Sequence, residues 1–229
     1  MTIDTIERFD EAIASHNRNE LRHLGLFYDT ETTGLPLFSE PSSDPRQPHI
    51  VQIGAILVDM DTREELEVLD VIIRPDGWTI PDEVAAIHGI TTERALAEGI
   101  PAKEALTRFV GMWGANSSVV RVAFNEGFDA RLVRIALFRH FDEEAADNWK
   151  DGVTHDVMKV VTPICKLPPT AKMVAARRGN QFKQPKLSEA YEHFFGEPLE
   201  GAHSALVDVR ATLRIHWHVT DLAQQRAAV

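Results

Sequence analysis

The sequence has very little cysteine, since Cys165 is the only one in 229 residues. A single cysteine cannot form an internal disulfide, which excludes the disulfide-stapled class of secreted domains and fits a reducing compartment. The chain also lacks any run approaching about 18 consecutive apolar residues, so no membrane span is expected. Residues 1–20 are polar and acidic and lack a signal-peptide pattern. We therefore predict a cytoplasmic protein with no membrane partner.

Positive charge is also scarce, because the formal net charge is −11. Such a balance argues against broad binding of phosphate backbones over the whole surface. One stretch reverses it: from Val157 to Ser188 there is no Asp or Glu, but there are seven Lys and Arg residues. This stretch is either a solvated basic loop or a basic face on an acidic body.

The chain has enough apolar residues, 44%, to form one large packed domain. We predict a helical extension over residues 1–20, followed by a single domain over residues 21–229. Apolar runs bounded by turn residues predict strands over 24–30, 50–59, 66–74 and 118–124, with a fifth ending at His155 and Asp156. Helical spacing predicts helices over 82–88, 91–98, 101–113, 128–140, from 157 to about 165, 186–195, and from 202 or 204 to 224. An early hairpin followed by alternating helices and strands predicts an α/β fold with a mixed central sheet.

Two acids close the first predicted strand, in the string Tyr28-Asp29-Thr30-Glu31-Thr32-Thr33-Gly34. Side chains alternate along a strand, so Asp29 and Glu31 point the same way. Neighbouring carboxylates repel each other, and the usual remedies are solvent, a shared proton or a divalent cation such as Mg²⁺ or Mn²⁺. Taken alone, the pair also fits a solvated strand end or the nucleophilic Asp of a phosphatase.

Three more residues in the second half of the chain could complete a metal site. Asp129 follows the fourth predicted strand, where it would lie beside the end of the first if the two strands are neighbours. His203 and Asp208 are five positions apart, which on one helix would point them about 140° away from each other. We therefore expect His203 on a loop or first turn and Asp208 on the helix proper.

Together, these residues resemble a known family. The elements Asp29-x-Glu31, Asn125-x-x-Phe128-Asp129 and His203-x-x-x-x-Asp208 resemble those of the DEDD exonucleases of the histidine subclass, which include proofreading exonuclease subunits and oligoribonuclease. The string from Ile87 to Thr91 also resembles an element of the proofreading-like members. The resemblance covers roughly residues 24–213. Phe124 stands where the family often has His, and the Pro-rich stretch 35–48 is an insertion expected at the rim of the site.

The resemblance implies a ribonuclease H-like fold with a mixed five-stranded sheet flanked by helices, and two Mg²⁺ or Mn²⁺ ions. Carried over by position, Asp29, Glu31, Asp129 and Asp208 hold the ions, and His203 is the general base. The implied reaction is 3′–5′ removal of nucleoside 5′-monophosphates from single-stranded ends, DNA being favoured over RNA. A polymerase or a second copy of the chain are further candidate partners. The alternative function is a catalytically silent nucleic-acid-binding or polymerase-docking module.

Substrate contacts are predicted around these acids and on the basic stretch. The residues expected to approach the terminal nucleotide are Thr30, Thr32, Gly34, Leu35, His88, Asn125 and Phe128. The residues expected to guide the phosphates of the strand are Arg177, Arg178, Lys183 and Lys186. A phosphatase is disfavoured because its early motif would be Asp-x-Asp and its late motif would contain Lys rather than His203.

Overall fold

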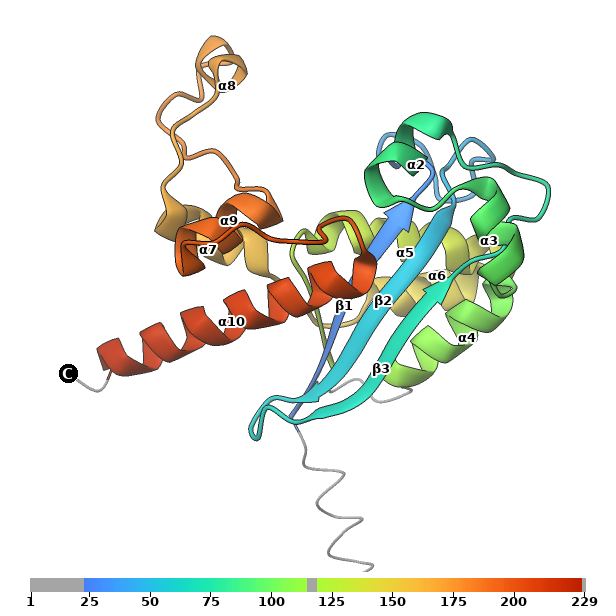
Figure 1. Cartoon of the computed structure of the whole chain (residues 1–229), viewed down its shortest axis with the longest axis horizontal. Helices are drawn as coiled ribbons and strands as arrows, with labels where there is room; N and C mark the ends of the chain where they lie inside the picture. The colour runs from blue at the N-terminus through green and yellow to red at the C-terminus, as the bar shows by residue number, and fades with distance from the viewer. Residues whose placement is uncertain (1–22, 115–118, 228–229) are drawn as a thin grey trace, which may run out of the picture.

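A computed structural model of the chain describes residues 23–114 and 119–227. Its centre is one five-stranded sheet in the order β3-β2-β1-β4-β5 (Figure 1). The strands are β1 (Leu24–Thr32), β2 (Ile50–Asp59), β3 (Glu65–Ile72), β4 (Val120–Ala123) and β5 (Thr154–Asp156). The predicted N-terminal helix over residues 1–20 lies outside the described residues.

The sheet is mixed, as predicted. β1 pairs with β2, and β2 with β3, in the antiparallel sense, whereas β1–β4 and β4–β5 are parallel. The antiparallel pairs form the expected hairpin, and the parallel pairs are connected through helices. Because β1 and β4 are neighbours and run in the same direction, the residues that follow them meet at one edge of the sheet.

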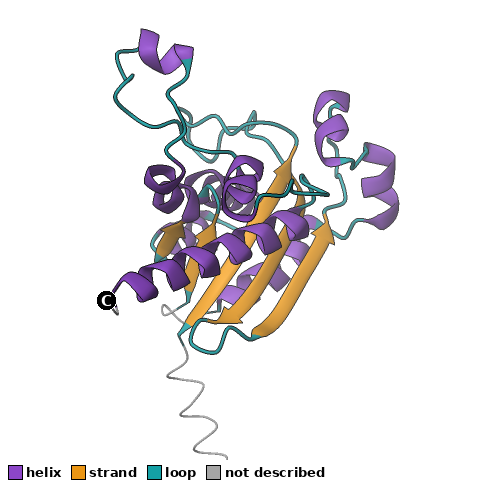
Figure 2. Ribbon diagram, turned by 60° about the vertical axis from the view of Figure 1, so that its left-hand side comes forward, coloured by secondary structure: helices purple, strands orange, loops and turns teal. Residues whose placement is uncertain are grey.

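Helices cover both faces of the sheet (Figures 1 and 2). One face is covered by α4 (Ala102–Trp113), α5 (Glu126–His140) and α6 (Glu143–Lys150), whose buried side chains cluster with Leu26 and Tyr28 of β1. The other face is covered by α7 (Val157–Cys165), α9 (Leu187–Phe195) and α10 (Ala205–Ala227), which cluster with Phe27. Side-chain alternation along β1 therefore directs its odd-numbered residues toward α10. None of the helices in the described ranges is long and apolar enough to cross a bilayer.

The remaining helices are short. α2 (Asp82–His88) and α3 (Thr92–Glu98) follow the hairpin, and the hydroxyl of Thr91 caps α3 by accepting from the backbone N–H of Arg94. The sequence analysis did not predict α6 or α8 (Ala171–Ala175), which lies within the basic stretch. α5 begins two residues before its predicted start, at Glu126, so Asp129 lies in its first turn.

The Pro-rich insertion 35–48 is a loop, as predicted, and is firmly attached. The buried side chain of Gln47 bonds both the N–H (2.9 Å) and the carbonyl (3.0 Å) of Leu37 across the loop. Arg139 of α5 donates to the carbonyls of Pro48 (3.0 Å) and Gln47 (2.8 Å). A further bond joins Arg131 to the hydroxyl of Ser42 at 2.9 Å. These bonds hold the loop as a fixed wall beside the end of β1.

Candidate active site

Asp29 and Glu31 lie on β1 on the face toward α10, and both are partly exposed. Across the antiparallel pair with β2, Asp29 stands opposite Gly54 and Glu31 opposite Gln52. Directly opposed residues have side chains on the same face of a sheet. On this face of the sheet, the neighbours of the two acids are therefore Gly54, which has no side chain, and the polar Gln52.

Asp129 approaches the same edge from α5, on the other face of the sheet. Its carboxylate accepts from the hydroxyl of Thr30 at 2.7 Å and from the backbone N–H of Thr30 at 3.0 Å. Thr30 and Asp129 are both buried. These two bonds fix the Asp129 carboxylate next to the strand that carries Asp29. The approach of the Thr30 backbone to the substrate stays a prediction.

The start of α10 rests directly on β2, and Gly54 makes this approach possible. A Cβ at position 54 would lie only 2.5 Å from the backbone carbon of Ala205 and from the backbone nitrogen of Leu206. Beside it, the buried Gln52 accepts from the N–H of Ala205 at 3.2 Å and donates to Asp70 of β3 at 2.7 Å. Gln52 thereby satisfies one of the free N–H groups at the helix start.

This seat brings His203 and Asp208 to the two acids of β1. His203 lies on the loop before α10, and Asp208 lies in the first turn of the helix, which is the arrangement that their spacing predicts. The backbone N–H of His203 donates to the Asp208 carboxylate at 3.2 Å. Ligand atoms of Glu31, His203 and Asp208 all lie within 4.8 Å of one another. His203 is exposed and has a left-handed backbone, with φ of 69°.

Burial raises the pKa of every acid in this group, and repulsion from the other acids adds to it for Asp29 and Glu31. Burial, then the charges of Asp129, Asp208 and Glu31, raises the pKa of Asp29 well above its usual value. The pKa of Glu31 is raised to about 8 by burial and by the charges of Asp208 and Asp129. Burial also raises the pKa of Asp129 to about 7 against the hydrogen bonds from Thr30, and that of Asp208 to about 6 against the N–H of His203.

These residues fit a divalent cation. Oxygen ligands from several carboxylates are the donor set that hard cations prefer. One oxygen of Asp208 is buried without a hydrogen-bond partner, so it is available for an ion. A cation would also stabilise the ionised form of the four carboxylates against burial, and would relieve the repulsion that adds to the pKa of Asp29 and Glu31.

The other predicted contact residues lie around the acids in different ways. The hydroxyl of Thr32 donates to the carbonyl of Gly34 at 2.8 Å, and Leu35 beside them is 79% exposed. Asn125 is exposed before α5, where its carbonyl accepts from the N–H of Phe128 at 2.9 Å. Phe128 is only partly exposed.

His88, at the end of α2, is 8% exposed, and its Nδ1 accepts from the N–H of Ile90 at 3.1 Å. Burial and the nearby charge of His203 lower the pKa of His88. Its Nε2 is buried, and the backbone of Thr32 acts against the lowering of this pKa. The ring of His88 lies close to both Thr32 and His203.

The four predicted guiding residues divide into two pairs. Lys183 forms an ion pair with Glu189, which also accepts from the backbone N–H of Lys186, and these bonds belong to the start of α9. Arg177 and Arg178 lie outside any such pairing within the described residues, on the segment that carries α8.

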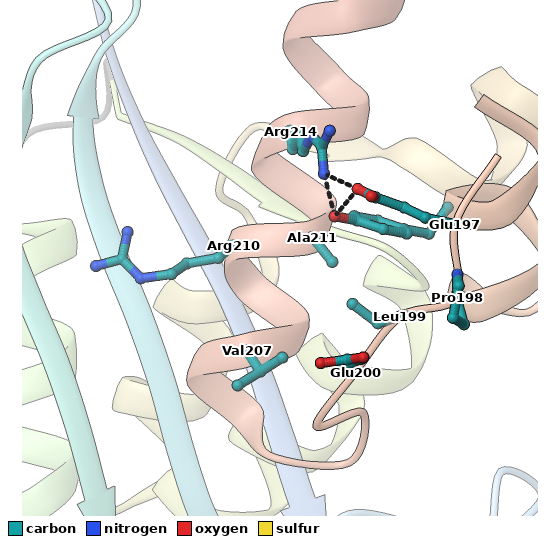
Figure 3. A pocket seen from close by; sticks show the side chains of 9 residues that line it. Glu197, Pro198, Leu199, Glu200, Val207, Arg210, Ala211 and Arg214 are labelled. Atoms are coloured by element: carbon teal, nitrogen blue, oxygen red, sulfur yellow. Dashed lines mark hydrogen bonds and ion pairs between the residues drawn. The ribbon is translucent and has the colours of Figure 1, made fainter. Parts of the chain in front are cut away.

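The segment that leads from α9 to His203 is attached to α10 by hydrogen bonds. Arg214 of α10 bonds Glu197 at 2.8 Å and also the hydroxyl of Tyr191, which ties the loop after α9 to the helix (Figure 3). The side chains there, with Val207 and Leu199, surround a cavity of about 480 Å³ on the side of α10. These bonds help to define the path of the chain from α9 to His203.

Comparison with known families decides the identity. The model of a family described as exonuclease matches residues 26–216, which is most of the chain. The chain belongs to this exonuclease family. The assignment confirms the histidine-subclass resemblance found in the sequence, and it implies divalent metal ions. A comparison with curated proteins gives no match.

Solved structures show the same fold for this exonuclease-family chain. E. coli exonuclease I with a dT13 oligonucleotide matches with a TM-score of 0.68 and 21% identity over 90% of this chain. The zinc-bound form of the E. coli exonuclease I–single-stranded DNA complex matches with a TM-score of 0.65 and 23% identity over 87%. The chain spans only 42% and 41% of those two chains. The likeness confirms the predicted ribonuclease H-like architecture.

Gln52 and Gly54 are the site residues that the sequence analysis missed. The signal was present, because they interrupt the otherwise apolar run Ile50-Val51-Gln52-Ile53-Gly54-Ala55-Ile56. A buried amide needs partners, and a glycine inside a strand often marks a close backbone approach. Which element would approach could not be read from the sequence.

Proposed function

We propose that the chain is a metal-dependent 3′–5′ exonuclease that releases nucleoside 5′-monophosphates from single-stranded 3′ ends, with DNA favoured. The observation that carries the proposal is the meeting of Glu31, His203 and Asp208 within 4.8 Å, beside Asp29 and Asp129. Family membership and the oligonucleotides named with the exonuclease I structures support the same substrate class.

In this proposal, Asp29, Glu31, Asp129 and Asp208 hold two Mg²⁺ or Mn²⁺ ions. Such a pair, when bound, supplies an activated water and stabilises the charge on the leaving 3′ oxygen. Asp29 and Glu31 need this countercharge because partial burial and repulsion disfavour their ionised forms. Residues 21–229 act as a single exonuclease domain, since all the strands described within it join one sheet.

His203 is the proposed general base. Its imidazole is exposed on the loop beside Asp208, where a ring nitrogen can take a proton from the attacking water. Only its backbone N–H bonds Asp208, which leaves both ring nitrogens free of that contact. Leu35, His88 and Phe128 are the proposed surfaces for the terminal sugar and base, with Thr32, Gly34 and Asn125 next to them.

The test uses a 5′-labelled single-stranded 20-mer incubated with Mg²⁺, Mn²⁺ or EDTA. We expect a ladder of products shortened from the 3′ end, release of nucleoside 5′-monophosphates by chromatography, and no reaction in EDTA. Asp29→Ala should abolish the ladder. The rates of shortening of matched DNA and RNA oligomers show which of the two nucleic acids is preferred. Binding without shortening in either metal would favour the silent module instead.

A further inference from the structure

The segment between α7 and α9 leaves the body of the molecule as an arm. We call residues 168–182 the basic arm; it contains α8, which stands well away from the sheet in both overall views (Figures 1 and 2). Its two ends meet at a neck, where the N–H of Lys183 donates to the carbonyl of Leu167 at 3.1 Å. The arm is therefore an excursion from one point of the fold.

The basic arm keeps its shape through hydrogen bonds among its own residues. The hydroxyl of Thr170 caps α8 by accepting from the N–H of Met173 at 3.2 Å, and Arg178 donates its N–H to the carbonyl of Met173 at 2.8 Å. Within the described part of the chain, no hydrogen bond or ion pair joins an arm side chain to the body. The body thus gives no structural reason for the composition of the arm.

That composition is positive and partly apolar. The arm carries Lys172, Arg177 and Arg178, all exposed, and no acid. Val174 and Phe182 are 57% and 45% exposed, so apolar and aromatic surface lies among the cations. Cations that track phosphates, combined with aromatic faces on which bases stack, are typical of sequence-tolerant binding to single strands.

The rest of the molecule strengthens this assignment by contrast. The whole chain has a formal charge of −11. Four acids, Asp29, Glu31, Asp129 and Asp208, gather at one edge of the sheet, which we call the catalytic edge. Because the chain as a whole is acidic, a strand leaving that edge gains attraction from the three cations of the arm. In Figure 1 the arm and the arrowhead of β1 lie at the same end of the molecule.

We propose that the basic arm binds the phosphate backbone of the single strand whose 3′ end is in the catalytic site. This inference rests on the proposed function for what occupies the site, but the binding itself can be measured without turnover. Three cations predict about three phosphate contacts. For a single strand, these contacts should steepen the slope of log affinity against log salt concentration by about 2.

The neck allows a clean deletion. A carbonyl that accepts from an N–H three positions later defines a β-turn, so residues 168–182 can be replaced by Asn-Gly between Leu167 and Lys183. A second variant, K172Q/R177Q/R178Q, keeps the arm and removes its charge. The matched control K103Q/R108Q/K150Q removes three cations from α4 and α6, on the other side of the sheet. Circular dichroism and thermal melting verify that each variant folds.

Fluorescence anisotropy in EDTA, at salt concentrations from 50 to 300 mM, measures binding of a 5′-labelled single-stranded 20-mer. We expect both arm variants to lose about tenfold or more in affinity at the lowest salt, and to lose about 2 in slope. The control should change less than twofold. In Mn²⁺, the arm variants should lose more kcat/KM on the 20-mer than on a 3-mer, because the longer strand offers the arm more phosphates.

The outcomes separate the two proposals. Unchanged affinity and slope in both arm variants would overturn the arm as a nucleic-acid surface, and would direct attention to a protein partner. A wild-type protein that fails to bind the 20-mer would overturn it as well. Arm-dependent binding without any shortening in Mg²⁺ or Mn²⁺ would retain the arm and reject the exonuclease proposal.

Discussion

The catalytic edge and the basic arm carry opposite charges and are built in opposite ways. At the edge, the four acids are held by buried contacts such as Thr30 to Asp129 and Gln52 to Ala205. On the arm, the cations are exposed, and none of those described bonds the body. Charges that must chelate an ion need fixed positions, whereas charges that follow a flexible backbone need only be present.

This difference predicts how each region responds to substitution. A change at the edge should act through geometry and be large for a single atom, whereas a change on the arm should follow the number of charges removed. The substitutions below test the edge, from the largest expected effect to the smallest.

His203→Asn should cause the largest loss without removing an acid. Asn tolerates the left-handed backbone at this position, and the N–H that bonds Asp208 is retained. Loss of a general base should lower kcat about 10²- to 10⁴-fold. Isothermal titration with Mn²⁺ should give an affinity close to that of the wild type.

Asp208→Ala is the companion variant, and it should lose Mn²⁺ affinity together with activity. If His203→Asn kept wild-type turnover, the role of His203 as base would be wrong. If it lost Mn²⁺ binding as completely as Asp208→Ala, His203 would be a ligand instead.

Thr30→Val removes one oxygen from a side chain of the same shape. Asp129 then loses the 2.7 Å bond from the hydroxyl but keeps the bond from the backbone N–H. Residues that orient metal ligands are typically worth about 10- to 100-fold in activity. Because that bond lowers the pKa of Asp129, its loss should also move the acidic limb of the kcat profile to higher pH.

Thr30→Ser is the control, since it keeps the hydroxyl and should stay near the wild-type profile. Equal profiles for the Val and Ser variants would show that the hydroxyl does not orient Asp129 for catalysis.

How far the sequence predicted these features depends on their range. Strand alternation gave the shared face of Asp29 and Glu31, and helical geometry gave the separate elements of His203 and Asp208, because both are local periodicities. The helix α6 was missed although Asp142 caps it, accepting from the N–H of Ala145 at 2.8 Å, and Trp149 is buried. Its buried residues Ala146 and Trp149 leave too short an apolar pattern to stand out.

Contacts between distant segments could not be predicted in the same way. The bond from Thr30 to Asp129 joins residues 99 positions apart, and that from Ala205 to Gln52 joins residues 153 apart. The basic stretch could be recognised in the sequence by its charge. The ion pair of Lys183 with Glu189 could not be predicted, and it shows that Lys183 belongs to the start of α9 and not to the arm.

Gly54→Ala tests the close contact between β2 and the start of α10. The added Cβ would lie 2.5 Å from backbone atoms at positions 205 and 206, which cannot move aside as a flexible side chain could. Overpacking of this kind costs about 1 to 3 kcal/mol. Urea unfolding should show that loss, and kcat should fall because Asp208 and His203 move with the helix start. Gly111→Ala, where nothing lies within 4 Å of the new Cβ, is the control and should not destabilise. A Gly54→Ala variant as stable and active as the wild type would rule out the seat.

The smallest expected effect is a pH dependence of stability in the metal-free protein. Glu31 and Asp129 have folded-state pKa values of about 8 and about 7, raised from ordinary values near 4, so they contribute stability at low pH that is lost as pH rises through those values. Half-buried His49 and His216, with pKa values lowered to about 4, act in the opposite sense, but only below about pH 6.5, where unfolded histidines gain a proton.

The informative window is therefore pH 6.5 to 8.5. In EDTA, the melting temperature should fall across it by at least about 2–4 °C, equivalent to about 1 kcal/mol for a chain of this size. Glu31→Gln should flatten the slope, and saturating Mg²⁺ should abolish it, because binding requires the ionised acids. If the melting temperature of the wild type in EDTA had the same pH slope as that of Glu31→Gln, Glu31 would already be ionised at pH 6.5. Its pKa would then not be raised by burial and by the neighbouring acids.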